Sequence, residues 1–339
     1  MSEGGLDIDG ISTGINYLVG DRHRVIDQLV PVDRTEIGKE MRIIHDDLNC
    51  DSVRIAGAKT ERAIVSAKIA MENGLLPWMS PRFNYANFEQ TKKELSIYCK
   101  KAINYGLEEG PLIVANELVF DCEDATGTIL KTGLERHETI HKMIQSGERP
   151  DMTDKVIELM KIARAAGWKG TLSYAAFAYE NVDWQKVKGQ GLGNIEAGIN
   201  LYWERDLSTN EARPAEHYER NIQAAIQNAS GLKLNIFEFG TVPHGQGLAW
   251  GGGGFKLEGD PDYDAQKNAL LEYLGVLKNH TDVGLFLYTF NERKKNQAGS
   301  YGIVGGDNKD RYEILPAGKE FGEFAKSRIN DGAVIDIGT

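Results

Sequence analysis

Short apolar runs alternate with amphipathic stretches along most of the chain. Each run is followed by a polar loop and then, in most cases, by apolar residues spaced three and four positions apart. This alternation is typical of parallel strands joined by crossover helices. The predicted strands lie near residues 13–18, 51–56, 75–80, 111–116, 170–176, 195–202, 233–239 and 283–289. Eight strand–helix units can close on themselves, so the sequence predicts an α/β fold of the (β/α)₈ TIM-barrel type.

Residues with strong preferences for helix ends separate these units. Asp33, Thr60 and Thr153 each stand where they can cap the start of a helix, and Pro316 stands where it can open the last one. The fifth unit is the weakest, because only a short helix over 182–188 can follow its strand. The end signals therefore agree with the strand positions.

Two loops of this pattern are unusually long. They span residues 118–150 after the fourth strand and 240–261 after the seventh. Both follow the carboxyl ends of strands, which is the face where barrels carry their functional sites. No linker or low-complexity block divides the chain, so residues 1–339 are expected to form one domain with its core over about 11–329.

The charge balance excludes some classes of partner. The chain has 39 basic and 50 acidic residues, which gives a formal net charge of −11, and it has no basic run. Binding to nucleic acid or to an anionic membrane is not expected, because phosphates require lysine and arginine. No apolar run approaches the length of about 18 residues that a spanning helix requires. The first residues lack a basic segment followed by an apolar stretch, so a cytoplasmic protein is expected, or a secreted one if a signal peptide was removed.

Motifs for metals and cofactors are missing from the sequence. Its three cysteines have neither Cys-x-x-Cys spacing nor an even number, and no His-x-His or His-Glu-x-x-His pattern occurs. The glycine-rich stretches have neither P-loop spacing nor a place between a strand and a helix. We therefore expect no metal ion and no cofactor. The oligomeric state cannot be deduced from these features.

Two glutamates end apolar strands. The apolar run at 111–115 stops at Asn116 and Glu117, and the run at 234–237 stops at Glu238. A carboxylate at the end of a buried strand is costly unless it is paired or used. Two of them at one end of a barrel can face each other across its mouth, as glycoside hydrolysis requires. A structural ion pair is the alternative role for each.

On these residues the chain resembles clan A of the retaining glycoside hydrolases, although it matches no single family. The resemblance implies that Glu117 is the acid/base and Glu238 the nucleophile. It also implies that Arg54 supports the nucleophile, that Asn116 binds the sugar 2-hydroxyl, and that Tyr202 bonds the nucleophile. The sequence departs from the clan at the eighth strand, where the run 285–290 lacks the usual tryptophan.

Aromatic and polar residues near the strand ends are candidates for sugar contacts. Sugars present apolar faces that stack on aromatic rings. Packing or simple exposure is the alternative role for each candidate, and Trp168 is expected to be a core residue because it precedes its strand. The candidates for substrate binding are Trp78, Trp184, Trp203, Trp250, Arg82, Asn84 and His244. Glu180 could be part of the polar rim or a substrate contact.

The sequence therefore favours a retaining glycosidase, or a transglycosidase, that works through a covalent glycosyl-enzyme intermediate on a carbohydrate substrate. The alternative is an inactive barrel that binds carbohydrate or a partner protein, since a fold alone does not establish function. Both glutamates are present, which favours the enzyme. A metal-dependent hydrolase would need His ligands that the sequence lacks, and an aldolase would need a lysine at a strand end, for which Lys59 is the nearest candidate.

Overall fold

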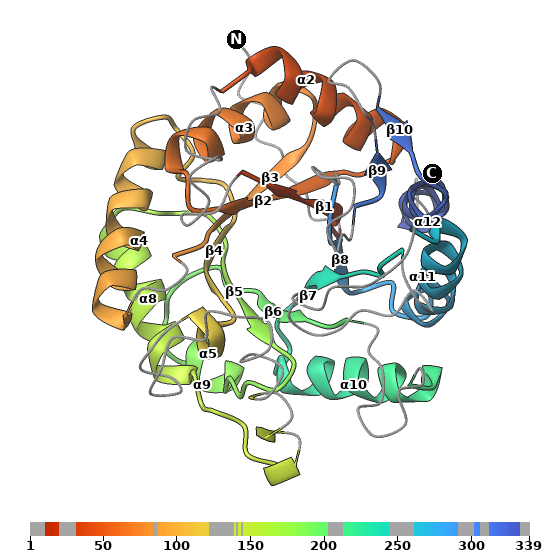
Figure 1. Ribbon diagram of the computed structural model, residues 1–339. Coiled ribbons are helices and arrows are strands. Elements are labelled where there is room, and N and C mark those ends of the chain that lie inside the picture. The colour runs from red at the N-terminus through yellow and green to blue at the C-terminus, as the bar shows by residue number, and fades with distance from the viewer. Residues whose placement is uncertain are drawn as a thin grey trace, which may run out of the picture.

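The protein is a closed barrel of eight parallel strands (Figure 1). The computed structural model describes residues 11–19, 32–83, 87–121, 139, 142–143, 145–202, 213–243, 261–290, 302–305 and 312–332. The strands are β1 (Thr13–Leu18), β2 (Ser52–Gly57), β3 (Leu76–Pro81), β4 (Leu112–Asn116), β5 (Leu172–Phe177), β6 (Ala197–Asn200), β7 (Leu234–Phe239) and β8 (Gly284–Leu287). Each strand pairs with its neighbours in chain order, and β1 pairs with β8 to close the ring. The predicted (β/α)₈ barrel is confirmed.

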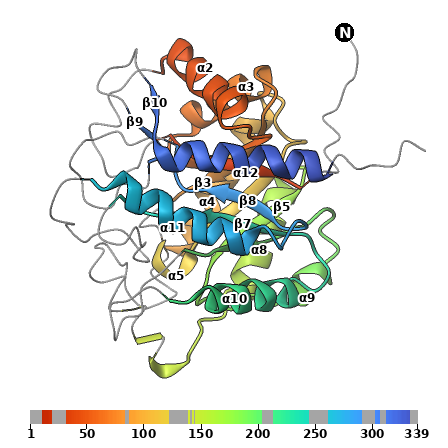
Figure 2. The same ribbon diagram turned by 90° about the vertical axis from the view of Figure 1, so that its right-hand side faces the viewer.

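Helices surround this barrel, and α10, α11 and α12 lie side by side on its outside (Figure 2). The longer helices are α2 (Arg34–Arg42), α3 (Thr60–Glu72), α4 (Phe88–Ile103), α8 (Thr153–Ala165), α10 (Ala215–Asn228), α11 (Tyr263–Leu277) and α12 (Pro316–Gly332). The shorter elements are the π-helical turn η1 (Ile43–Asp47), α5 (Leu118–Asp121), α9 (Trp184–Lys188) and the antiparallel pair β9 (Val304–Gly305) and β10 (Glu313–Ile314). None of the described helices is both long and apolar enough to cross a membrane.

The helix ends follow the capping signals with two corrections. Asp33 caps α2, because its carboxylate accepts hydrogen bonds from the backbone of Thr35 and Glu36, and Pro316 opens α12 as predicted. Thr60 and Thr153 are instead the first residues of their helices and not the caps. The Thr153 hydroxyl accepts a hydrogen bond from the backbone of Asp183, which ties α8 to the start of α9. Both predictions were wrong by one residue.

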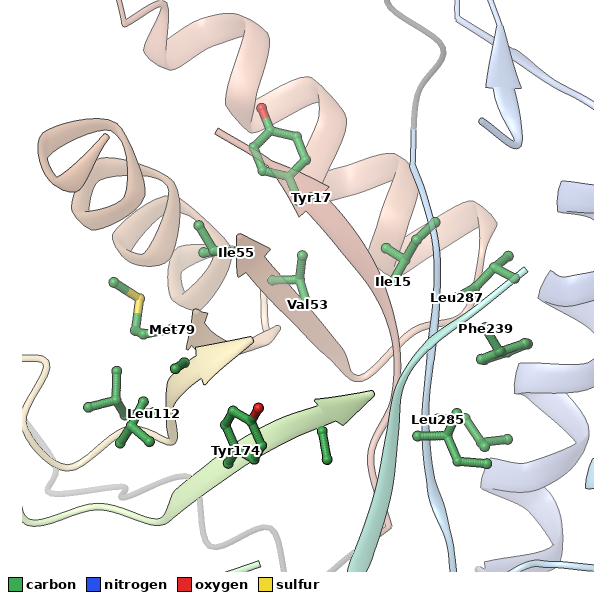
Figure 3. Close-up of a cluster of buried hydrophobic side chains, with 14 of the residues drawn as sticks. Ile15, Tyr17, Val53, Ile55, Met79, Leu112, Tyr174, Phe239, Leu285 and Leu287 are labelled. Carbon is green, nitrogen blue, oxygen red and sulfur yellow. The ribbon is translucent and has the colours of Figure 1, made fainter. Parts of the chain in front are cut away.

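The main core lies between the barrel and its helices. Figure 3 shows some of its side chains, which come from strands all around the barrel, among them Ile15, Val53 and Leu285. Trp168 belongs to this cluster, as predicted, and its indole N–H donates to the carbonyl of Gly110 at 2.8 Å. Burial of each large apolar side chain contributes roughly 1.5–3 kcal/mol. This outer core holds the strands in place while their inward side chains build the site.

A second cluster fills the barrel interior. The rings of Trp78 and Phe237 lie 5.1 Å apart although β3 and β7 are not neighbouring strands, so their contact crosses the barrel. Space for the Phe237 ring exists because position 198 is a glycine. A Cβ atom on Gly198 would lie 2.3 Å from the Phe237 ring and 2.6 Å from the Tyr174 carbonyl. Packing at this level leaves no room for even one methyl group.

We predict that Gly198→Ala lowers the free energy of unfolding by about 1–3 kcal/mol, since the added methyl group displaces a buried ring. Gly275→Ala is the matched control, because nothing lies within 4 Å of its Cβ position and the residue is within α11. This control is expected to be stabilising by up to about 1 kcal/mol through helix propensity. Urea unfolding measures both variants. Equal stability of the two variants would contradict the packing account.

Candidate active site

Three side chains hold the carboxylate of Glu238 at the end of β7. Arg54 donates from Nη1 to Oε1 at 2.8 Å, and Arg82 donates to the same oxygen. Tyr202 donates its hydroxyl to Oε2 at 2.6 Å. Only 5 % of the Glu238 side chain is exposed. Hydrogen bonds to both of its oxygens therefore fix the orientation of the carboxylate, and two cations contact one of these oxygens.

Arg54 is the centre of this network. Its side chain is completely buried, and its guanidinium donates to Asn116 Oδ1 at 2.7 Å and to Asn16 Oδ1 at 3.1 Å. It also donates to Ser80 Oγ at 3.1 Å and to the backbone oxygen of Phe237 at 3.1 Å. Burial lowers the pKa of Arg54, and the charge of Glu238 opposes that shift. A buried guanidinium with so many acceptors cannot turn, so it sets the position of every group it contacts.

The charge state of Glu238 follows from these contacts. Burial alone would raise the pKa of its carboxyl group. The guanidiniums of Arg82 and Arg54 and the hydrogen bond from Tyr202 outweigh burial, and the pKa of Glu238 lies below its ordinary value. Glu238 is therefore ionised at neutral pH, which is the state that a carboxylate nucleophile requires.

Glu117 directly follows β4 and joins the same network through two amides. Asn200, at the end of β6, donates from Nδ2 to Glu117 Oε1 at 2.9 Å and to Asn116 Oδ1 at 3.1 Å. Because Asn116 also accepts from Arg54, hydrogen bonds lead without a break from Glu238 through Arg54, Asn116 and Asn200 to Glu117. Both predicted catalytic glutamates thus belong to one hydrogen-bonded system at the carboxyl ends of the strands.

Tyr288, just beyond β8, lies in the same region and was not singled out by the sequence analysis. Its ring contacts that of Tyr202 edge-on, with centroids 6.2 Å apart. Burial raises the pKa of the Tyr288 hydroxyl. The charged groups that act on this hydroxyl are Arg82, Glu238, Arg54 and Glu117. Tyr288 therefore places an aromatic ring next to Tyr202, directly after β8.

A small pocket opens beside this centre, between the ends of β3 and β4. Arg82, Asn116 and Thr91 are the polar residues that line it, and Phe83 is the aromatic one. The remaining lining residues are Pro81, Ala115 and Leu118. Among the described residues, no group of three or more His, Cys, Asp or Glu side chains is arranged to hold a metal ion.

Glu180 is a third buried carboxyl group near the site. It lies just after β5, is 7 % exposed, and accepts hydrogen bonds from Tyr174 Oη at 2.7 Å and from the backbone of Val119 at 2.6 Å and Phe177 at 2.7 Å. Burial raises the pKa of Glu180 to about 8. The prediction that Glu180 belongs to the rim or contacts substrate is corrected, because its carboxyl group is enclosed by backbone and Tyr174.

Two tryptophans are placed differently from the prediction. Trp78 fills the barrel interior with Phe237 and Phe286 and is 2 % exposed, and Trp184 packs in the outer core at the start of α9 and is 3 % exposed. Their burial gives both rings a packing role in place of the predicted sugar contact. Four other candidates lie outside the described residues: Asn84, Trp203, His244 and Trp250.

The supporting amides of this site carry a signal that sequence reasoning did not use. Asn16 lies within β1 and Asn200 ends β6, and both are at most 1 % exposed. A polar residue inside an otherwise apolar parallel strand must find a partner in the barrel. Such residues could have been proposed as site residues on that ground alone.

Comparison with known proteins shows the fold and no single family. No protein-family model matches the chain, and no curated protein matches it. A solved GH113 β-1,4-mannanase superposes with a TM-score of 0.60 at 15% identity, over 94% of this chain and 99% of the mannanase. A GH5 xyloglucan-specific endo-β-1,4-glucanase from a metagenomic library, in complex with cellotriose, gives 0.58 at 13% identity, over 92% and 96% of the two chains. A β-glucanase from Saccharophagus degradans, in complex with cellotetraose, gives 0.56 at 10% identity, over 95% and 88%.

These structural neighbours are clan A glycoside hydrolases with eight-stranded parallel barrels. The resemblance inferred from the sequence is therefore confirmed at the level of the fold. At such low identity the likeness does not extend to the reaction or the substrate.

We predict that Glu180→Gln flattens the dependence of stability on pH. The pKa of Glu180 is about 8 in the folded protein, against an ordinary value of 4.5. Between these two pH values the folded protein keeps the proton on Glu180 and the unfolded chain has lost it. The contribution of Glu180 to the free energy of unfolding is therefore fully present below pH 4.5. It is lost as the pH rises towards 8, by at most about 1.4 kcal/mol per pH unit. Calorimetric Tm values at pH 5–8 measure the slope.

Tyr174→Phe is the matched control for this measurement, because it removes a hydrogen bond to Glu180 and keeps the titrating group. Both variants should lower the Tm at pH 5, and only Glu180→Gln should reduce the decline towards pH 8. Parallel profiles for Glu180→Gln and the wild type would refute the assignment.

Proposed function

We propose that the protein is a retaining glycosidase with Glu238 as nucleophile and Glu117 as acid/base. The observation that carries the proposal is the hydrogen-bonded network that joins the two carboxyl groups at the carboxyl ends of β4 and β7. Two guanidiniums and a phenol hold Glu238, and Asn200 donates to Glu117. The cations and the phenol favour the ionised form of Glu238, which suits a nucleophile, and the acid/base role then goes to Glu117.

The reaction proceeds in two displacements. Glu238 attacks the anomeric carbon while the bond from that carbon to the leaving oxygen breaks, and Glu117 gives its proton to that oxygen. A glycosyl ester of Glu238 results. Glu117 then takes a proton from water, the water oxygen attacks the same carbon, and Glu238 leaves as a carboxylate. Two inversions at one carbon give net retention.

The supporting residues divide the work of orientation. Arg54 and Tyr202 hold the two oxygens of Glu238, so that the nucleophile needs no reorganisation when the sugar arrives. Asn116 uses its carbonyl oxygen to accept from Arg54 and Asn200. That arrangement fixes the amide plane and leaves Nδ2 as the group that donates to a sugar hydroxyl.

The substrate class that we propose is a β-linked glycan of glucose or mannose. The neighbours are named as β-1,4-mannanase and β-1,4-glucanase, and two of them are complexes with cellotriose or cellotetraose. The direct test is a panel of 4-nitrophenyl β-glucoside and β-mannoside, β-1,4-gluco-oligosaccharides and β-1,4-manno-oligosaccharides. Proton NMR of the first product anomer should show the β configuration. An α anomer as first product would establish inversion, and binding without turnover would favour the inactive barrel.

Replacing each glutamate should give a different kinetic signature. Glu238→Gln should abolish turnover on every substrate of the panel that the wild type cleaves. Glu117→Ala should lower kcat/KM on substrates with poor leaving groups by roughly 10²–10⁴-fold. Added azide should then restore turnover of Glu117→Ala on an aryl glycoside and yield a β-glycosyl azide, because azide attacks the intermediate without base assistance. Equal effects of the two replacements, with no azide product, would refute the assigned roles.

Tyr202→Phe should move the acidic limb of the kcat/KM profile to higher pH. The hydrogen bond from Tyr202 favours the ionised form of Glu238, so its loss raises the pKa of that carboxyl group. Tyr98→Phe is the matched control, since the buried Tyr98 hydroxyl in α4 has no hydrogen-bond partner among the described residues. An unchanged limb in Tyr202→Phe would show that Glu238 does not control it.

A further inference from the structure

The backbone of Glu117 has an unusual conformation. Its φ angle is +43°, in the left-handed region that residues with a side chain rarely occupy. Such a conformation persists only when the surrounding structure over-determines it, and it occurs most often at functional sites. The conformation also directs the Glu117 side chain, because the side chain leaves the same backbone atom.

The peptide groups around Glu117 are held from β5. The Glu117 N–H donates to the carbonyl of Ala175 at 2.9 Å, and the Leu118 N–H donates to the hydroxyl of Tyr174 at 2.8 Å. The next N–H, that of Val119, donates to Glu180 Oε1 at 2.6 Å. Three successive backbone donors are thus bonded to β5 or to the carboxyl group that follows it.

Tyr174 and Glu180 act together in these contacts. The Tyr174 hydroxyl donates to Glu180 Oε2 at 2.7 Å, and the Phe177 N–H donates to the same oxygen at 2.7 Å. We call this pair the Tyr174–Glu180 clamp. It connects the turn after β5 to the first turn of α5, directly after Glu117.

Burial makes this clamp necessary for the backbone it holds. Tyr174 and Val119 are completely buried and Leu118 is 2 % exposed, so water cannot replace the acceptors. Tyr174 belongs to the core cluster between the barrel and its helices (Figure 3), and Glu180 is 7 % exposed. The position of the clamp therefore suits support of Glu117 and not contact with a substrate.

We propose that Glu180, acting with Tyr174, is a positioning residue that holds Glu117 in the geometry for proton transfer. This inference rests on the proposed function, in which Glu117 is the acid/base. A buried carboxyl group whose described partners are backbone N–H groups and one phenol is retained at a cost in stability. Holding the catalytic backbone in a strained conformation is the role that the contacts support.

The two carboxyl groups also interact electrostatically. Burial is the main cause of the raised pKa of Glu180, and the charge of Glu117 adds to it. Tyr174 and Glu117 are the titratable groups that act on Glu180 within the described part of the chain. Glu180 therefore loses its proton less readily when Glu117 is charged.

The first test compares leaving groups in Glu180→Gln and Tyr174→Phe. The probes are the 2,4-dinitrophenyl and methyl β-glycosides of a sugar that the wild type cleaves. Dinitrophenolate is a good leaving group and needs no proton, whereas methanol leaves only when an acid protonates its oxygen. A misplaced Glu117 should therefore lower kcat/KM on the methyl glycoside and not on the dinitrophenyl glycoside. We expect kcat/KM to fall about 10- to 100-fold on the methyl glycoside, the order expected for a misplacement of about 1 Å, and less than about threefold on the dinitrophenyl glycoside.

Glu196→Gln is the matched control for both variants. Glu196 is a partly buried carboxylate that accepts from Asn235 at 2.6 Å, but it precedes β6 at the opposite end of the barrel. This variant should keep wild-type rates on both probes. Equal losses on the two probes in Glu180→Gln, or no loss on either, would overturn the proposal.

The second test does not depend on activity. Amide hydrogen exchange at pH 7, followed by NMR, should be at least about tenfold faster at Leu118 and Val119 in Glu180→Gln and Tyr174→Phe than in the wild type or Glu196→Gln. If the wild type cleaves none of the glycosides, the proposed function fails, and exchange alone decides whether the clamp holds Glu117. Unchanged exchange at these two amides would overturn the proposal whatever the rates are.

Discussion

The buried ion pair between Arg54 and Glu238 is the interaction on which the rest of the site depends. It joins β2 to β7 across the barrel, and the same guanidinium reaches Asn16 on β1 and Asn116 on β4. Removal of the Glu238 carboxylate would leave the buried charge of Arg54 without its anionic partner, at a cost of about 3–5 kcal/mol. The barrel must therefore close around this pair with every acceptor in place. The contacts that position the site residues are therefore the same contacts that require the sheet to close correctly.

Burial alone does not decide the chemistry of a carboxyl group in this protein. Glu238 and Glu180 are both almost fully buried, yet their pKa values are shifted in opposite directions. Two guanidiniums on Glu238 overcome the cost of desolvation, whereas the hydrogen bonds to Glu180 do not. Glu238 is therefore the carboxyl group that carries a charge in the site, and Glu180 is the one that supports the backbone. Glu117 accepts a hydrogen bond from the amide of Asn200, and its backbone has a positive φ angle.

Much of the fold could be predicted from the sequence, because the hydrophobic period reports directly which face of each element is buried. The predicted strands start within two residues of the observed ones, and Glu117 and Glu238 stand where their strands end. Trp78 and Trp184 could not be placed, because the sequence does not tell a ring at the mouth from a ring in the core. The contact of Tyr288 with Tyr202 and that of Glu180 with the Val119 N–H join residues distant in the chain, and the hydrophobic pattern does not report such contacts.

The most direct test of the central claim is covalent trapping of the nucleophile. The wild type would be incubated with 2,4-dinitrophenyl 2-deoxy-2-fluoro-β-glucoside or the corresponding mannoside, chosen by which parent glycoside it cleaves. The fluorine slows both the formation and the hydrolysis of the glycosyl ester. The dinitrophenolate leaving group makes formation fast again, so the ester accumulates. The account predicts one label per chain, located by peptide mass spectrometry on Glu238. A label on any other residue, or continued cleavage of the parent glycoside by Glu238→Gln, would contradict it.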